Sequence, residues 1–367
     1  MPAYDAFLLL SFGGPEGPDD VLPFLENVTR GRGVPAERLA EVAEHYRAYG
    51  GVSPINDQCR HLLETIGTAF RAGGIELPLY WGNRNWHPFI ERAVRQMRAD
   101  GVGRAIAFVT SAYSSYSACR QYLDDIDRAV AAVGPGAPRI DKIRPYFNHP
   151  GFIEPFAANV ESALAELPAG AQAGARLVFT AHSVPVGMAA ASGSPSAHTV
   201  LTGTGVPGAV GGRYAAELRE ASSLISERVR GGSLPFDLVF QSRSGPPSVP
   251  WLEPDVNDHL EALAKGENPP SGVVVVPVGF VSDHMEVVHD LDVEAAATAA
   301  SLGLPFARAK APGPDPRFAQ MACELVAERA YGAAPLALGR FGPRAYPEIG
   351  SCPADCCRYT PARPRKA

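Results

Sequence analysis

The sequence predicts an α/β protein built from two lobes, each a doubly wound parallel sheet, with a cleft between them. Short apolar runs alternate with amphipathic helical stretches along most of the chain, which is typical of βα units with helices on both faces of a sheet. The alternation pauses near Pro150 and then begins again, which indicates two similar halves. At 367 residues and 46% hydrophobic residues, the chain is long enough and apolar enough for two cores.

The first half opens with an apolar strand and with helices whose ends are marked by proline and glycine. The strand Ala6–Phe12 ends at a Gly-Gly-Pro turn, and Asp19 or Asp20 can cap the helix that follows. A second helix opens at Pro35 and stops at Gly50. The rest of this half alternates as a helix at Pro54–Ala72, a strand at Leu79–Gly82, a helix at Pro88–Met97, a strand at Ala105–Ser111, a helix through Tyr122 and Ile126, and an extended segment near Ile140–Tyr146.

The second half repeats this pattern. It contains a helix at Phe152–Leu167, a strand at Leu177–Ala181, a helix at Ala215–Val229, a strand at Leu238–Gln241, a helix at Val256–Ala264, a strand at Val273–Val278, an acidic helix, and a final helix near Arg317–Ala330. Two segments break the pattern: Gly187–Gly212, whose small and polar residues predict a mobile loop, and the tail after Gly332, which is rich in proline and glycine. We therefore expect a first lobe at 1–149 joined by the helix at 315–331, a second lobe at 150–314, and a cysteine-containing tail at 332–367.

Composition excludes several classes of function. The net charge is −6, from 33 basic and 39 acidic residues, so a nucleic-acid partner is not expected. No run of eighteen apolar residues predicts a membrane span, and no basic region precedes an apolar one at the amino terminus, so we expect a cytoplasmic protein. Cysteines in that compartment should not form disulfides, and three of the six stand close together in the tail, which hints at a metal site.

An acidic helix after the strand Val273–Val278 is the first candidate for chemistry. Glu286, Asp290 and Glu294 stand four residues apart and would form one stripe, with Ser282 or Asp283 as the cap. Like charges at this spacing repel, so the row suggests a cationic or proton-linked ligand at the end of the strand. The alternative interpretation is a solvated acidic face.

A histidine ends another strand of the same half. His182 follows the apolar run Leu177–Ala181 and precedes Ser183 and a turn proline, which presents an imidazole at the carboxyl edge of the sheet, where open α/β folds bind ligands. A single histidine there is often structural. Together with the acidic helix on a later strand, it favours function.

Three further turns have the composition of binding sites. Two glycines precede Ser53 at a helix start, where free backbone amides suit an anion or a carboxylate. The stretches NRNWHPF and QSRSGPPSVPW, the latter ending at Trp251, each combine a cation with an aromatic residue and suit a flat acidic ligand. For the first stretch the alternative is a plain glycine stop followed by a serine cap, and for the other two it is an ordinary surface turn. The Gly-Gly-Pro after the first strand lacks the full dinucleotide fingerprint.

Five motifs together resemble those of the ferrochelatases, which insert ferrous iron into a porphyrin. They are FTAHSVP, QSRSGPPSVPWLEPDV, GGVSPIN, NRNWHPF and GFVSDHMEVVHDLDVE, in register over roughly residues 5 to 330. The resemblance implies a Rossmann-like, chelatase-type arrangement of both lobes. It also implies that His182 faces the porphyrin centre and that Glu286 lies opposite, so that the two accept pyrrole protons and present iron. Asp290 and Glu294 would continue as an acidic row toward solvent, on a helix with a π-helical turn.

The resemblance also implies the porphyrin contacts. They are Phe12, Arg30, Arg32, Tyr46, Ser53, Ser115, Ser117 and Trp251. Two positions depart from relatives that use a coproporphyrin route. Phe12 stands where those relatives have a tyrosine that can contact the metal, so it would act only as an apolar floor, and His45 stands where they have an arginine, which puts one propionate contact in doubt.

The cysteine tail resembles that of members with a [2Fe-2S] cluster. Cys352, Cys356 and Cys357 fit the three carboxyl-terminal ligands of such members, and Cys119 is the best candidate for the internal ligand. The alternative is a disordered tail whose cysteines are incidental.

Several functions remain open at this level. We expect ferrous iron as a substrate. We expect coproporphyrin III as the porphyrin, because no apolar membrane-binding lip is evident and the motif sequences resemble those of soluble actinobacterial members. Protoporphyrin IX is the alternative substrate. Other hypotheses are a porphyrin or haem carrier without turnover, an iron-sulfur electron-transfer protein of flavodoxin-like fold, and a cobalt chelatase. We also expect a monomer that passes its product to another enzyme of haem biosynthesis.

Overall fold

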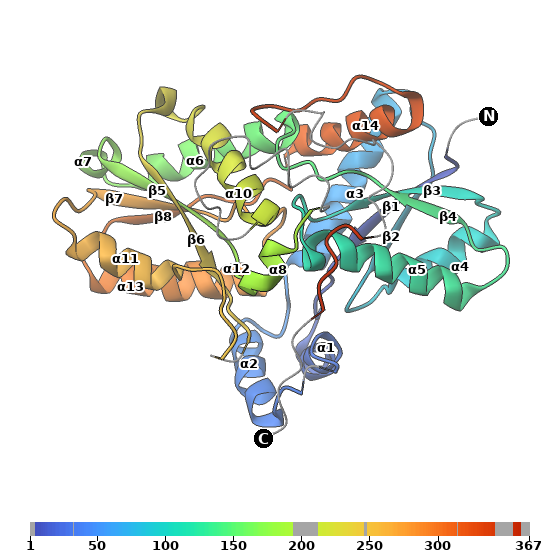
Figure 1. Ribbon diagram of the computed structural model, residues 1–367, viewed down its shortest axis with the longest axis horizontal. Helices are drawn as coiled ribbons and strands as arrows, with labels where there is room; N and C mark the ends of the chain where they lie inside the picture. Colours follow the sequence, from blue (N-terminus) through green and yellow to red (C-terminus); the bar gives the residue numbers. More distant parts are fainter. Residues whose placement is uncertain are drawn as a thin grey trace.

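The computed structural model describes residues 4–31, 33–193, 212–245, 248–313, 315–341 and 355–360. Two four-stranded sheets, all parallel, stand side by side with helices around each (Figure 1). The first has the order β2-β1-β3-β4 and the second the order β6-β5-β7-β8. Each chain path crosses to one side of the first strand and then returns to the other, so both sheets are doubly wound, as the sequence predicts.

The strands are short, and the inner strands of each sheet are mostly apolar and buried, because parallel strands covered on both faces need no polar side. Those of the first sheet are β1 (Ala6–Ser11), β2 (Leu79–Asn83), β3 (Arg104–Val109) and β4 (Arg139–Lys142). Those of the second are β5 (Ala175–His182), β6 (Phe236–Gln241), β7 (Gly272–Val276) and β8 (Phe306–Arg308). The sequence did not predict β8, since three residues carry too little periodicity.

Helices connect the strands and cover both faces of the sheets. In the first half they are α1 (Val21–Val28), α2 (Ala36–Ala48), α3 (Ile55–Ala72), α4 (Ile90–Ala99) and α5 (Gln121–Val133). In the second half they are α6 (Pro150–Glu166), α7 (Ala169–Gln172), α8 (Val186–Ala190), α10 (Gly212–Ser226), α11 (Val256–Lys265), α12 (Met285–Val287), α13 (Ala296–Ser301) and α14 (Pro316–Tyr331). Within the described residues, two π-helices, η2 (Tyr116–Arg120) and η5 (Val288–Ala295), and two 3₁₀ turns, η1 (Pro18–Asp20) and η4 (Arg230–Gly232), accompany these elements.

Several predicted boundaries need correction. The 3₁₀ turn η1 precedes α1, and the Asp20 carboxylate accepts hydrogen bonds from the Glu16 amide and the Trp86 indole instead of capping the helix. The segment predicted as a loop from Gly187 begins within α8, and residues 194–211 lie outside the described part of the chain. The division of the chain at residue 149 stays a prediction.

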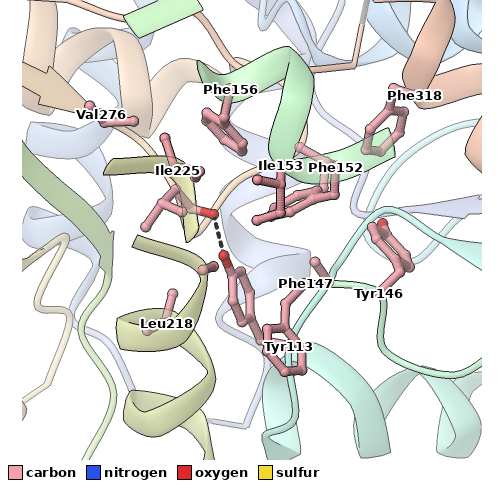
Figure 2. Close-up of a cluster of buried hydrophobic side chains, with 14 of the residues drawn as sticks. Tyr113, Tyr146, Phe147, Phe152, Ile153, Phe156, Leu218, Ile225, Val276 and Phe318 are labelled. Carbon is pink, nitrogen blue, oxygen red and sulfur yellow. Dashed lines mark hydrogen bonds between the residues drawn. The ribbon is translucent and has the colours of Figure 1, made fainter. Parts of the chain in front are cut away.

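One hydrophobic core joins the two halves. It includes Phe7 of β1, Phe152 of α6, Phe179 of β5 and Phe318 of α14. Figure 2 shows part of this core, in which aromatic side chains from both halves meet. α14 packs on both α3 and α6, so the last helix ties the two sheets together. The carboxyl ends of the central strands are thereby fixed relative to one another.

The hairpin of α1 and α2 projects beyond the sheets at the lower edge of Figure 1. Its apolar face forms a small cluster of its own, in which Phe24 and Tyr46 pack together with Met285 of α12. The hairpin of the first half therefore rests on the acidic helix of the second half.

Candidate active site

The central strand pair of the second sheet places the two predicted reactive segments together. β5 and β7 are hydrogen-bonded neighbours, and the chain passes to opposite sides of β5 at this point. Ligands of open α/β sheets bind outside the carboxyl ends of strands at such a switch point. His182 is the last residue of β5, and Glu286 lies in α12, which follows β7.

His182 presents one free ring nitrogen. Its Nδ1 lies 2.5 Å from the carbonyl oxygen of Ser183. Because a carbonyl oxygen only accepts, Nδ1 carries the proton and Nε2 keeps its lone pair. The side chain is 33% exposed, so Nε2 can receive a proton or coordinate a metal ion.

Glu286 faces that nitrogen. Its Oε2 lies 4.0 Å from Nε2 of His182, and its side chain is 48% exposed. The neighbouring Met285 is buried against the hairpin of α1 and α2, which holds the main chain from which Glu286 extends. The distance equals about two metal–ligand bonds of roughly 2 Å each, so the pair leaves space for one small cation between the two groups.

The acidic helix does not begin as predicted. Its N-cap residue is His284, and no side chain caps it. Asp283 instead accepts a hydrogen bond from Arg308 at 2.9 Å, while its amide donates to Oε1 of Gln58 at 2.9 Å. Gln58 lies in α3, so a helix of the first half helps to hold the loop that leads to Glu286.

Asp290 lies in the first turn of the π-helix η5, which follows the helix that carries Glu286. Its carboxylate accepts hydrogen bonds from Ser242 and, at 3.3 Å, from the side-chain amide of Gln241. Burial, together with the nearby carboxylates of Glu286 and Glu294, raises the pKa of Asp290 to about 6. The hydrogen bonds from Ser242 and Gln241 lower this pKa and offset part of the rise. A carboxyl group with this pKa can both take up and release a proton near neutral pH.

Glu294 lies at the outer end of the same π-helix. Its Oε1 is 3.3 Å from Nε2 of His289, and the His289 ring stacks on His45 of α2 with centroids 4.1 Å apart. Burial, followed by the neighbouring His289, lowers the pKa of His45. The position at which the resemblance implied an arginine thus carries an imidazole that packs against η5.

Two of the predicted porphyrin contacts, Tyr46 and Phe12, belong to the first half of the chain. Tyr46 is buried, and burial followed by Glu286 and Asp290 raises the pKa of its hydroxyl, which keeps it neutral. Phe12 follows β1, is 38% exposed, and packs edge-on against Phe24 at 6.4 Å. Phe12 thus offers an apolar surface.

The three predicted serines have different surroundings. Ser53 is buried, and its amide donates to the carbonyl of Pro15. The Ser115 hydroxyl accepts from the amide of Ala118 as the cap of η2, so it is already engaged. Ser117 lies 3.7 Å from the sulfur of Met188 in α8, on the chain just after His182.

Trp251 lies beside the segment that follows His182. Main-chain hydrogen bonds join Leu252 to Val184 and Val186 to Pro250 on either side of it. Its indole nitrogen is buried and has no hydrogen-bond partner within the described residues.

The two predicted arginine contacts follow α1. Arg30 is exposed just beyond α1, and Arg32 lies outside the described residues.

The sequence did not identify Gln241 and Ser242 as partners of Asp290. Both belong to the QSRSGPP motif, which suggested only a cation and an aromatic group. The register of the strands could have indicated this role. Gln241 pairs with His182 between β6 and β5, so both residues lie at the same edge of the sheet.

Three of the four predicted cluster cysteines lie together in a buried place. The sulfurs of Cys356 and Cys357 are 3.8 Å apart, and the Gly193 amide donates to Cys357 at 3.1 Å. Hydrogen bonds with Cys119 and Cys356, and then burial, raise the pKa of the Cys357 thiol. Cys352 lies outside the described residues. Within the described ranges, no three or more His, Cys, Asp or Glu side chains are arranged to hold a metal ion.

A search of the helices in the described ranges found none that is long and apolar enough to span a membrane.

Comparison with known proteins identifies the family. The ferrochelatase family model matches residues 4–330. The chain is 50% identical to the coproporphyrin III ferrochelatase of Streptomyces griseus, over 99% of this chain and 96% of the relative. It is 52% identical to that of Nocardia farcinica, over 97% of each, and 49% identical to a ferrochelatase of Rhodopirellula baltica, over 99% and 96%.

A solved structure agrees at the level of the fold. SirB from Bacillus subtilis, determined with Fe³⁺, superposes with a TM-score of 0.50 at 12% identity and covers 89% of this chain and 96% of its own. This likeness concerns the architecture alone. The family match and the full-length relatives lead to one conclusion: the chain belongs to the ferrochelatase family, enzymes that insert iron into a porphyrin.

Proposed function

We propose that this protein inserts ferrous iron into coproporphyrin III to give coproheme, with His182 and Glu286 as the catalytic pair. The approach of Nε2 of His182 to Oε2 of Glu286, at 4.0 Å beyond the switch point of the second sheet, carries the proposal. The names of the full-length relatives from Streptomyces and Nocardia support the choice of porphyrin.

The reaction exchanges two pyrrole protons for one Fe²⁺ ion. The lone pair on Nε2 of His182 is a suitable first acceptor, because Nδ1 holds its own proton against the Ser183 carbonyl. Glu286 is half exposed and can accept the second proton or hold the incoming ion, since hard oxygen and imidazole ligands both suit Fe²⁺. Two N–H bonds break while four nitrogen–iron bonds form, and the two protons that leave carry the same charge as the Fe²⁺ ion that enters, so charge balances.

Asp290 and Glu294 would continue the route to solvent. Asp290, whose pKa is raised to about 6, can pass protons between Glu286 and the outer end of η5 without becoming permanently charged or neutral. Glu294 lies at that outer end. We propose that the two side chains carry protons outward and partly hydrated iron inward.

The porphyrin would lie over Phe12, with its rim carboxylates directed to polar groups around it. We propose Tyr46, Ser53, Ser115, Ser117, Trp251, Arg30 and Arg32 as its contacts. Coproporphyrin III bears four propionates and protoporphyrin IX bears two, so more of these polar contacts can be made with coproporphyrin III. Substituting a contact residue should therefore change the ratio of the activities toward the two porphyrins, which is the direct test.

The deciding experiment is anaerobic incubation of the purified protein with Fe²⁺ and either porphyrin, following the Soret and Q bands. We expect turnover of coproporphyrin III that exceeds turnover of protoporphyrin IX, and near-complete loss in His182→Ala. The matched control is His259→Gln, which removes a histidine that pairs with Asp237 at 3.0 Å. Tight porphyrin binding without turnover would instead favour a carrier, and faster use of protoporphyrin IX would overturn the substrate choice.

We also propose a [2Fe-2S] cluster held by Cys119, Cys352, Cys356 and Cys357. The gathering of the first, third and fourth of these sulfurs supports it, and such a cluster would cross-link the tail to the first half of the chain. Iron and acid-labile sulfide should be present in the protein as isolated and lost in Cys119→Ser. Protein without acid-labile sulfide after anaerobic purification would contradict the cluster.

A cytoplasmic location, a monomeric state and a partner enzyme that receives the product stay predictions. Cell fractionation and sedimentation velocity test the first two. Transfer of product to candidate enzymes of the same pathway, faster than its release to albumin, tests the third.

A further inference from the structure

Two buried tyrosines meet behind the catalytic pair. Tyr113 follows β3 in the first half of the chain, and Tyr214 lies in α10 of the second half. Their rings pack edge to face, with centroids 6.3 Å apart and planes at 86°. Only 2% and 5% of the two residues is exposed, and each hydroxyl donates to a main-chain carbonyl of the protein.

Tyr214 holds the main chain of the catalytic histidine. Its hydroxyl donates to the carbonyl oxygen of His182 at 3.0 Å. Neighbouring hydrogen bonds, from the Ser183 amide to Gln241 and from the Ser183 hydroxyl to Leu252, attach the same strand end to β6 and to the chain beyond it. Tyr214 adds the attachment to α10, on another side of the strand.

Tyr113 holds the segment that leads to Glu286. Its hydroxyl donates to the carbonyl oxygen of Val278 at 2.8 Å, the bond drawn as a dashed line in Figure 2. The next residue, Gly279, donates to Thr180 of β5 and runs so close to that strand that an added Cβ would lie 2.6 Å from Cβ of Ala181. The position of this segment relative to His182 is therefore set within narrow limits.

Glu217 joins the two tyrosines into one unit. It lies one turn after Tyr214 in α10, and its carboxylate accepts from the amide and the hydroxyl of Ser114 at 2.7 and 2.8 Å. Arg213 donates to the same carboxylate at 2.6 Å, so the buried charge is paired. The segment that carries Tyr113 is thus fixed to the helix that carries Tyr214.

We propose that Tyr113 and Tyr214 are positioning residues that set the gap between His182 and Glu286. One hydroxyl fixes the main chain of the histidine, the other fixes the start of the segment that carries the glutamate, and the contact between the rings, together with Glu217, links the two. A misplacement of about 1 Å in such a pair lowers a rate strongly, because both groups must reach the same reacting atoms. The proposal rests on the function proposed above.

The test compares Tyr113→Phe and Tyr214→Phe with Tyr146→Phe. Tyr146 is a matched control, since it is also buried and its hydroxyl also donates to a main-chain carbonyl, that of Val109 at 2.7 Å. We expect the first two variants to lower kcat about three- to tenfold, the rate equivalent of one hydrogen bond, with KM for porphyrin and for Fe²⁺ changed by less than about twofold. Tyr146→Phe should lower thermal stability about as much as Tyr113→Phe and Tyr214→Phe do, but leave kcat unchanged.

Two further measurements separate positioning from general destabilisation. The double variant Tyr113→Phe/Tyr214→Phe should lose less than the product of the two single effects, because both variants disturb the same gap. In spectra of ¹⁵N-histidine-labelled protein, the His182 ring signals, assigned with His182→Ala, should shift in Tyr214→Phe and stay in place in Tyr146→Phe. That readout does not need turnover, so it separates a failure of this proposal from a failure of the proposed function. Wild-type kcat and unshifted His182 signals in Tyr214→Phe would overturn it.

Discussion

Nε2 of His182 lies 4.0 Å from Oε2 of Glu286, although the two residues belong to different βα units of the second sheet. The neighbouring strands β5 and β7 end at the same edge, and Met285, next to Glu286, is buried against the α1–α2 hairpin. The pairing therefore follows from sheet topology and from the packing of the α1–α2 hairpin. It supplies two proton acceptors at one place.

Asp290→Asn should slow the reaction without unfolding the protein. The amide keeps the shape of the side chain near Ser242 and Gln241 but cannot take up or release a proton, so we expect kcat to fall about tenfold. Steady-state kinetics with saturating Fe²⁺ measure the change. The matched control is Asp258→Asn on the exposed face of α11, which should have wild-type kcat, and wild-type kcat in Asp290→Asn would remove that residue from the proposed route.

Phe12→Ala should weaken porphyrin binding more than it slows the chemistry. The ring is 38% exposed and offers an apolar surface supported by Phe24, so its removal should raise KM for the porphyrin about fivefold or more with little change in kcat. Leu336→Ala removes a similarly exposed apolar side chain elsewhere and serves as the control. An unchanged KM in Phe12→Ala would place the porphyrin away from this ring.

Gly279→Ala should damage both stability and activity. An added Cβ would lie 2.6 Å from Cβ and 2.7 Å from Cα of Ala181, so either β5 or the segment before Glu286 has to shift. We expect the free energy of unfolding to fall by about 1–3 kcal/mol, as in other overpacked sites. Gly170→Ala in α7 is the control, because nothing lies within 4 Å of the added atom, and urea unfolding that fails to separate the two variants would contradict this expectation.

His149 should make the stability of the protein depend on pH. Burial, and then the Arg144 charge, lowers its pKa to about 3, and the ordinary value of 6.5 applies once the chain unfolds. Protons therefore bind preferentially to the unfolded chain below about pH 6.5, and stability is complete above that pH and falls as the pH drops toward 3. A shift of this size corresponds to about 2 kcal/mol of stability lost between pH 7 and pH 5.

His149→Asn isolates this effect. The asparagine oxygen can replace Nδ1 as acceptor of the Gly151 amide at the start of α6, while the group that titrates is gone. Urea unfolding of both proteins at pH 7 and pH 5 should show the wild type losing more stability than the variant. Parallel losses would show that His149 has no part in the pH dependence.

Much of the fold was predictable because the apolar runs are short and continuous. The run around Val273 is buried throughout β7, and the strand that ends at His182 lies where its pattern placed it. β8 and α8 were not predicted, because a three-residue strand carries too little alternation and a five-residue helix has little more than one turn.

The site was predictable in part. The residue types of His182 and Glu286, and their places after two apolar strands, are enough to indicate a reactive pair. The partners of Asp290 were not evident, because Ser242 and Gln241 reach it through the register of β6 and the π-helical turn of η5, and both depend on long-range packing. The roles of Tyr113 and Tyr214 were hidden for the same reason, since a buried tyrosine has the same sequence pattern as any core residue.

The most direct test of the central claim is the rate of anaerobic Fe²⁺ insertion into coproporphyrin III by Glu286→Gln, measured beside Glu261→Gln. Glu261→Gln is the matched control, because it makes the same substitution at an exposed position of α11, where Glu261 pairs with Lys265. We predict that Glu286→Gln loses about a hundredfold or more in kcat with an unchanged unfolding midpoint, while Glu261→Gln matches the wild type. Turnover by Glu286→Gln within about twofold of the wild type, a difference too small for a lost proton acceptor, would contradict the claim.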